Sequence, residues 1–324
     1  MGQTRDSKRS PSRSEVHPAT VWLRLLRAPN LFTVPGDPVA GLVLSLQTNT
    51  LPVTDTCFVI ATALCLYAAG ILLNDLMDVR EDLGVTPWRP FAHGLVERNH
   101  LQGAIFAGFA FGLLFAGLVG LECIAVAAGL SLSILSYNFG LKRIAFLGPL
   151  VMGLCRGFSV MLGVAAAAAD GTWSYPGILA SLAVTIYIAC VTGYARYERE
   201  LHRPAWIAYL PIIGCSLAIL LLLPVWSGAA IWNSIAFLIP FFAVAAICGM
   251  ILARVPHSDP EAGTHPAPES CNPGLVGTLI RALLWMQAGL IWLGSASWPV
   301  ATIGCFLVLA WWPSRRLSRM FYVS

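Results

Sequence analysis

The sequence predicts an all-α polytopic membrane protein, a helical bundle with about nine to ten transmembrane helices. Of its 324 residues, 57% are hydrophobic and only 11% are charged, and the mean hydropathy is +0.73. Soluble domains carry about 25% charged residues. Apolar stretches of about 17–25 residues, the length that crosses a bilayer as a helix, recur along the chain. We place them at residues 29–47, 56–73, 103–120, 121–138, 147–168, 174–194, 205–226, 231–253, 275–293 and 297–312.

The basic residues between these stretches predict the orientation, because Lys and Arg are retained on the cytoplasmic side during insertion. They precede the first stretch and return after every second one, near 80–98, 142–143, 196–203, 254 and 315–319. The intervening connections, near 48–55, 120, 169–173, 227–230 and 294–296, contain no Lys or Arg. We therefore expect ten spans, both termini in the cytoplasm, and a multi-pass protein of a bacterial inner membrane.

The same pattern predicts one membrane domain over residues 21–324. Residues 1–20 are rich in Ser and Arg without an apolar core, which predicts a disordered cytoplasmic tail. Two inner loops are expected, at 74–102 and 254–274, and the second is rich in Pro and Ser, as flexible connectors are. The net charge of +4 fits this topology and attraction to anionic lipid; no nucleic-acid-binding module is recognisable. The nine Cys residues form no CxxC pair, so we expect no structural disulfides.

The densest acidic cluster stands at the end of the second apolar stretch. Residues 74–82 read Asn-Asp-Leu-Met-Asp-Val-Arg-Glu-Asp. On a helix at about 100° per residue, Asp75, Asp78 and Asp82 fall on one stripe, with no obvious basic partner between them. Converging carboxylates of this kind bind hard cations. The alternative is a solvated helix at the membrane surface.

This segment, followed by Arg89-Pro90 and Gly94, resembles the first aspartate-rich motif of the UbiA-type membrane prenyltransferases, the relatives of 4-hydroxybenzoate polyprenyltransferase. Tyr137 and Lys142 are similar to the family's Tyr…Lys signature, although four residues separate them where many members have three. The resemblance continues over most of the chain, in Arg27-Ala28-Pro29-Asn30 of the first stretch and in Cys155-Arg156-Gly157 of the fifth.

The second aspartate-rich motif departs from the family pattern. Alignment on Tyr194-Ala195 puts Glu198 and His202 where relatives carry two aspartates. Because Mg²⁺ prefers oxygen ligands, this change weakens or removes a second metal site. The altered motif is similar to that of an ebo-operon-like branch of the family.

The resemblance implies Mg²⁺-dependent transfer of an isoprenyl group from an allylic diphosphate donor to a lipophilic or aromatic acceptor. Catalytic roles are implied for Asp75, Asp78, Tyr137 and Lys142. Substrate-binding roles are implied for Asn30, Asn74, Arg80, Arg89, Arg143, Arg156 and Tyr194. Metal-ligand roles are implied for Asp75, Asp78, Asp82, Glu198 and His202. Each basic residue of these sets has an alternative role as a topogenic charge at the lipid headgroups.

A rival reading is a non-catalytic protein on the same scaffold that binds or transports a prenyl lipid. The altered second motif favours it. The intact first motif opposes it, because a pure binder gains little from three unpaired carboxylates. A transporter would also carry ionisable residues deep in several spans. Only Arg156, Arg281 and Asp37 are candidates for that position.

Overall fold

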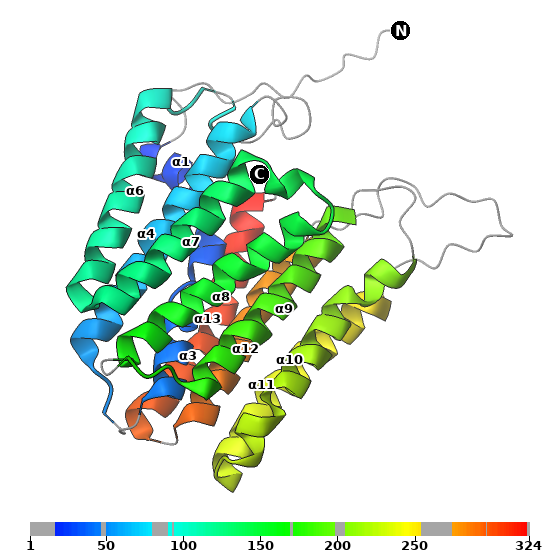
Figure 1. The fold of residues 1–324 in the computed structure, drawn as a ribbon. Coiled ribbons are helices and arrows are strands. Elements are labelled where there is room, and N and C mark those ends of the chain that lie inside the picture. Colours follow the sequence, from blue (N-terminus) through cyan, green and yellow to red (C-terminus); the bar gives the residue numbers. More distant parts are fainter. Residues whose placement is uncertain are drawn as a thin grey trace, which may run out of the picture.

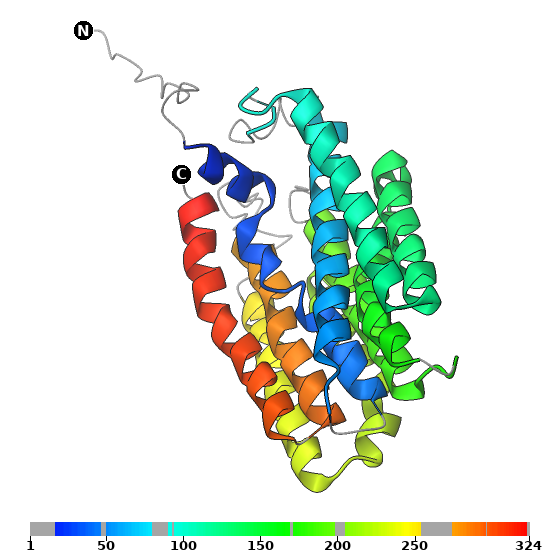
Figure 2. The ribbon, with the colours of Figure 1, turned by 90° about the vertical axis from the view of Figure 1, so that its left-hand side faces the viewer.

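A computed structural model describes residues 17–46, 50–79, 90–92, 94–168, 171–197, 205–253, 274–295 and 297–322 of the chain. The described residues form helices and no strand. The long helices run alternately up and down the bundle, and the first described helix, Pro18–Leu25, lies at the same end as the last turn of the final helix (Figures 1 and 2). They are α1 Pro18–Leu25, α2 Ala28–Leu31, α3 Gly36–Ser45, α4 Val53–Met77, α6 Arg98–Val119, α7 Leu121–Phe139, η1 Leu141–Arg143, α8 Leu147–Ala167, α9 Tyr175–Tyr197, η2 Ala205–Tyr209, α10 Leu210–Ser227, α11 Ile231–Ala253, α12 Gly274–Gly294 and α13 Trp298–Tyr322.

Eight of the described helices are long and apolar enough to cross a membrane. They are α4, α6, α7, α8, α9, the segment Trp206–Ser227 that contains α10, α11 and α12. Large apolar side chains on their outer faces are exposed, for example Phe106, Leu118, Leu220 and Phe242. In a bilayer such a surface contacts lipid, as the apolar composition predicts, and the chain is a multi-pass integral membrane protein.

The first predicted span, 29–47, is not one continuous helix. Its helical parts are the short α2 and the ten-residue α3. Pro35 and Pro38 flank the start of α3, and proline has no backbone N–H to continue a helix. Irregular backbone at membrane depth persists only where protein groups satisfy its carbonyls. Here side chains of α8 and α12 supply the hydrogen bonds to the break.

The last predicted span lies within α13, which continues to Tyr322 and carries Arg315 and Arg316 near its end. Its Ser314 hydroxyl is buried and donates a hydrogen bond to the Pro29 carbonyl at 2.7 Å. This hydrogen bond joins α13, the last described helix, to α2, which lies near the start of the described residues.

The expected loop 74–102 is shorter than predicted, because α4 runs to Met77 and α6 begins at Arg98. The stripe predicted through residue 82 is described only as far as Asp78, because Asp82 lies outside the described residues. Asp78 is the C-cap of α4, with φ −93° and ψ 5°, and its backbone N–H donates the last helical hydrogen bond to the Asn74 carbonyl. Most of the other expected loop, 254–273, lies outside the described residues.

The core consists of two apolar clusters that meet at α8. One contains Val160 with residues of α3 and α9 to α13, and the other contains Leu162 with residues of α1, α4, α6 and α7. Gly163 lies against α3 so closely that an added Cβ would overlap the Pro38 carbonyl. The absence of a side chain at Gly163 therefore allows α3 and α8 to touch at the backbone.

Candidate active site

The first motif lies at the last turn of α4 and is covered by η1. Asp75 is 5% exposed, on the inner face of the helix. Asp78, at the C-cap, forms an ion pair with the Lys142 ammonium, which also donates a hydrogen bond to Asn74 Oδ1 at 3.3 Å. The structure thus brings together Asn74, Asp78 and Lys142, three residues that the sequence assigned to one site.

Asp75 faces a basic residue from the other side. Arg27 Nη2 lies 3.6 Å from Asp75 Oδ1. Arg27 is the N-cap of α2 and has left-handed backbone angles, φ 48° and ψ 55°. Among the described residues it is the single non-glycine residue with positive φ. Such a conformation costs of order 1–3 kcal/mol and persists where surrounding contacts enforce it.

These two pairs correct one expectation from the sequence. The motif carboxylates were expected to converge without a basic partner, yet Asp75 faces Arg27 and Asp78 binds Lys142. The partners come from segments 48 and 64 residues away, so no local pattern signals them. The rival reading of a non-catalytic binder was opposed because the motif carboxylates were expected to be unpaired. Asp75 and Asp78 have basic partners, so they no longer oppose it.

Tyr137 stands near the end of α7, in the turn that precedes η1. Arg143, the last residue of η1, is exposed. Of the two residues of the Tyr…Lys signature, Lys142 is the one whose hydrogen bond and ion pair place it at the end of α4.

Arg196 is a residue that the sequence analysis used only for topology. It lies on the last turn of α9, and its guanidinium donates hydrogen bonds to the backbone carbonyls of Lys142 at 3.1 Å and Arg143 at 3.0 Å. Its position directly after Tyr194-Ala195, just before the altered second motif, is the feature of the sequence that could have indicated a role in the site. Tyr194 itself is 1% exposed and belongs to the apolar core.

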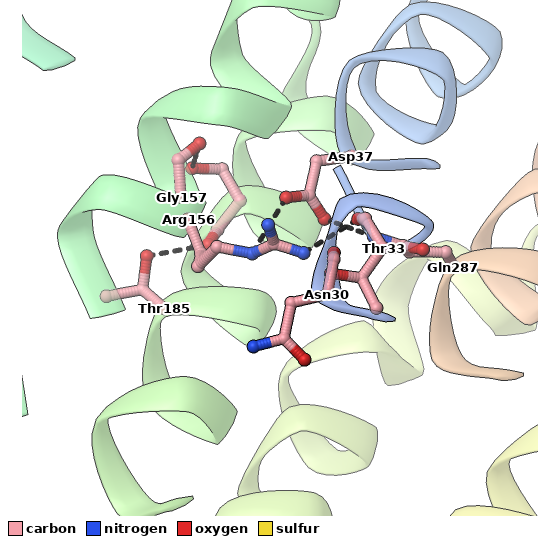
Figure 3. Close-up of polar contacts among 8 residues, drawn as sticks. Asn30, Thr33, Asp37, Arg156, Gly157, Thr185 and Gln287 are labelled. Atoms are coloured by element: carbon pink, nitrogen blue, oxygen red, sulfur yellow. Dashed lines mark hydrogen bonds and ion pairs between the residues drawn. The ribbon is translucent and has the colours of Figure 1, made fainter. Parts of the chain in front are cut away.

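A second polar cluster lies deeper in the bundle, at the break before α3 (Figure 3). Arg156 Nε lies 3.0 Å from Asp37 Oδ2, and Arg156 Nη2 donates to the Thr33 carbonyl at 2.7 Å. Gln287 of α12 donates to the same carbonyl at 2.7 Å and to Asp37 Oδ1 at 2.6 Å. Asp37 and Gln287 are completely buried. Arg156, assigned to substrate from the sequence, is therefore bound to protein groups that close the break.

Asn30 belongs to the same region. Its backbone carbonyl accepts a hydrogen bond from the Thr33 hydroxyl at 2.7 Å. Its side-chain amide points away from Asp37 (Figure 3).

Five predicted site residues lie outside the described part of the chain: Arg80, Asp82, Arg89, Glu198 and His202. Within the described part, no three His, Cys, Asp or Glu side chains stand close enough to hold a metal. Asn74, Asp75 and Asp78 supply oxygen ligands of the kind that Mg²⁺ takes. The other predicted ligands, Asp82, Glu198 and His202, lie outside the described residues.

The fold and this site define a class: an all-helical membrane protein with acidic and basic side chains gathered at one end of the bundle. The sequence profile of the UbiA prenyltransferase family matches residues 38–265. The chain belongs to that family, as the motifs predicted.

Comparisons with individual proteins agree with this assignment. The chain is 26% identical over 96 residues to the digeranylgeranylglyceryl phosphate synthase of Saccharolobus solfataricus, covering 30% of this chain and 34% of that protein. It is 25% identical over 186 residues to the enzyme of the same name from Methanoculleus marisnigri, covering 57% of this chain and 62% of that protein. The matched part therefore spans about a third of the S. solfataricus enzyme and somewhat under two thirds of the M. marisnigri enzyme.

Among solved structures, the fold is similar to that of a UbiA homolog from Archaeoglobus fulgidus bound to DMAPP and Mg²⁺. The TM-score is 0.58 at 13% sequence identity, over 82% of this chain and 98% of that one. At this identity the likeness concerns the fold alone.

Proposed function

We propose that this protein transfers an isoprenyl group from an allylic diphosphate to a lipophilic or aromatic acceptor in the membrane, with Mg²⁺. The observation that carries the proposal is the cluster of Asn74, Asp75, Asp78 and Lys142 at the end of α4, in a chain of the UbiA prenyltransferase family. The family relatives named above make a glyceryl phosphate with two geranylgeranyl groups, and the A. fulgidus homolog binds an allylic diphosphate and Mg²⁺.

In this proposal Asp75 and Asp78 hold Mg²⁺, with Asp82, Glu198 and His202 as further ligands from the sequence. The ion supplies electrostatic stabilisation of the departing diphosphate. The carboxylates are close to neutralised by Arg27 and Lys142 in the described structure. Replacement of these partners by a divalent cation keeps the local charge balanced.

The basic residues then bind the donor. Lys142, released from Asp78, donates charge-assisted hydrogen bonds to phosphate oxygens, and Arg80, Arg89 and Arg143 extend the same surface. In this proposal Tyr137, near the end of α7, stabilises the allyl cation that develops once the carbon–oxygen bond breaks. The acceptor attacks that cation and loses a proton as the new bond forms.

We place this site on the cytoplasmic side of a bacterial inner membrane, because the basic connections gather at the end of the bundle that carries η1. A cytosolic diphosphate donor reaches that side directly. Its apolar tail enters from lipid between the helices, which is a physical reason for such an enzyme to be a membrane protein.

The experiment incubates membranes that contain the protein with radiolabelled prenyl diphosphates of several chain lengths and a lipid extract as the source of acceptors. Mg²⁺-dependent transfer of label into the lipid phase is the expected result. Binding of label that is released unchanged, without a new lipid product, would favour the rival reading of a prenyl-lipid binder.

A further inference from the structure

Lys142 is one of only two lysines in the chain; the other is Lys8. Its side chain is 13% exposed, and its ammonium is bound to Asp78 and Asn74. It extends from η1, a single turn of three residues between α7 and α8. So short a helix does not hold a side chain in place by itself. Other elements must fix the backbone of η1.

One fixing contact comes from α9. The Arg196 guanidinium spans the carbonyls of Lys142 and Arg143 with two hydrogen bonds, of 3.1 and 3.0 Å. These are carbonyls at the end of a helical turn, where intrahelical donors are missing. A planar guanidinium presents two N–H groups side by side and matches two neighbouring carbonyls, as a single ammonium does not.

A second fixing contact comes from α8. Gly148 packs against Lys142, and an added Cβ there would stand 2.9 Å from the Lys142 carbonyl oxygen and 3.1 Å from its Cα. The backbone of Lys142 is therefore packed against Gly148 and hydrogen-bonded by Arg196. We use the name Lys142 clamp for these two residues.

We propose that Arg196 is a positioning residue, and that the Lys142 clamp fixes the backbone from which the Lys142 ammonium reaches Asp78 and, during turnover, the donor phosphate. The role of the clamp in turnover rests on the function proposed above. Through Arg196, the end of α9 supports Lys142 and with it the first motif. Arg196 is two positions before Glu198, so this support comes from the segment that leads into the altered second motif and does not depend on a metal.

The first test reads the position of Lys142 without turnover. The detergent-solubilised full chain is treated briefly with an amine acylating reagent, and mass spectrometry gives the modification of Lys142 relative to Lys8. The Lys142 side chain is 13% exposed and bound to Asp78, so the reagent reaches its amine slowly. Arg196→Gln is expected to raise this ratio about fivefold, as for the loss of a hydrogen bond to the backbone.

Three further variants calibrate the result. Asp78→Asn removes the ion-pair partner and is expected to raise the ratio most. Gly148→Ala displaces the Lys142 backbone by steric overlap and is expected to raise the ratio as well, and Arg196→Lys is expected to give an intermediate value. Arg98→Gln makes the same chemical change at an exposed position on α6 and is expected to leave the ratio unchanged.

Gel filtration establishes that each variant is folded. Where Arg196→Gln does not elute as the folded protein, Gly148→Ala and Arg196→Lys decide. An unchanged ratio in folded Arg196→Gln overturns the proposal when Asp78→Asn raises the ratio. An unchanged ratio in Asp78→Asn also overturns it, because Lys142 is then not held by that carboxylate.

The second test separates positioning from a general structural role. Arg196→Gln is expected to lower kcat/KM for the donor about tenfold in the wild-type background and to have no further effect in Lys142→Met, because residues that act through one group are not additive. Equal losses in both backgrounds would overturn the positioning role. If the wild-type protein transfers no prenyl group, the proposed function is contradicted. The positioning role of Arg196 is then still tested by the acylation ratio, which does not require turnover.

Discussion

Arg156 Nε lies 3.0 Å from Asp37 Oδ2 in the interior of the bundle, and this pair joins α8 to the break that precedes α3. The pair is completed by Gln287, which binds both Asp37 and the Thr33 carbonyl. A charged pair in this position is costly to desolvate, but it supplies donors to backbone groups that no helix satisfies. We infer that it holds α2, and with it Arg27 and Asn30, in place.

Replacement of Asp37 by Ala is therefore expected to destabilise the protein by about 3–5 kcal/mol, because the Arg156 guanidinium stays buried without its carboxylate. Thermal aggregation of the detergent-solubilised protein is the measurement. The double variant Asp37→Ala with Arg156→Met should recover part of the loss. Glu97→Gln is the control, since Glu97 is 64% exposed. A single variant that aggregates at the wild-type temperature would show that the pair does not stabilise the break.

The contact of Gly163 with the Pro38 carbonyl predicts a strong effect of a single methyl group. Gly163→Ala forces α3 and α8 apart, and we expect a loss of about 1–3 kcal/mol, as for overpacking in other cores. Gly249→Ala is the matched control, because no atom lies within 4 Å of its added Cβ. It should be neutral or slightly stabilising, since Ala favours a helix. Equal thermal stability of the two variants contradicts the packing described here.

Much of this architecture was predictable from the sequence, because the length and apolar composition of a segment indicate a membrane helix. The end of α4, the position of Lys142 and the family also followed from local motifs. The break between α2 and α3 did not, although Pro35 and Pro38 signal it in retrospect. Gln287 had a weak signal as well, being an amide in an otherwise apolar span.

The pairing of charges was the part that the sequence could not supply. Arg27, the N-cap of α2, and Asp75, on the last turn of α4, are brought together only by the tertiary fold, and no spacing rule connects them. The Arg196 contacts depend in the same way on how α9 meets η1. Sequence patterns identify which residues are unusual, whereas partners depend on three-dimensional packing.

The proposed orientation is tested by labelling two single cysteines, one at a time, with an impermeant maleimide in a background from which all nine native cysteines have been removed. Asn99→Cys, at the start of α6, should react only from the cytoplasmic side. Thr172→Cys, in the connection before α9, should react only from outside. Both positions are exposed in the structure. Outside labelling of Asn99→Cys would reverse the orientation and remove direct access for a cytosolic donor.

The second motif predicts a measurable change in the use of Mg²⁺. At an effective dielectric constant of about 20, one charge at about 4 Å is worth roughly 4 kcal/mol before desolvation. His202→Asp adds a negative charge and should lower the Mg²⁺ concentration for half-maximal rate. Glu198→Gln removes one and should raise it. If neither variant moves that concentration, this segment does not bind the metal.

The most direct test of the proposed function is the initial rate of Mg²⁺-dependent prenyl transfer by Asp78→Asn in lipid vesicles. Loss of this carboxylate removes a metal ligand, and we expect the rate to fall about 100-fold or more, the size of effect seen when a transition-state stabilising group is lost. Glu97→Gln, an exposed acidic residue beyond the site, should retain the wild-type rate. A folded Asp78→Asn protein that transfers the prenyl group at the wild-type rate would contradict the assignment of the catalytic metal to the end of α4.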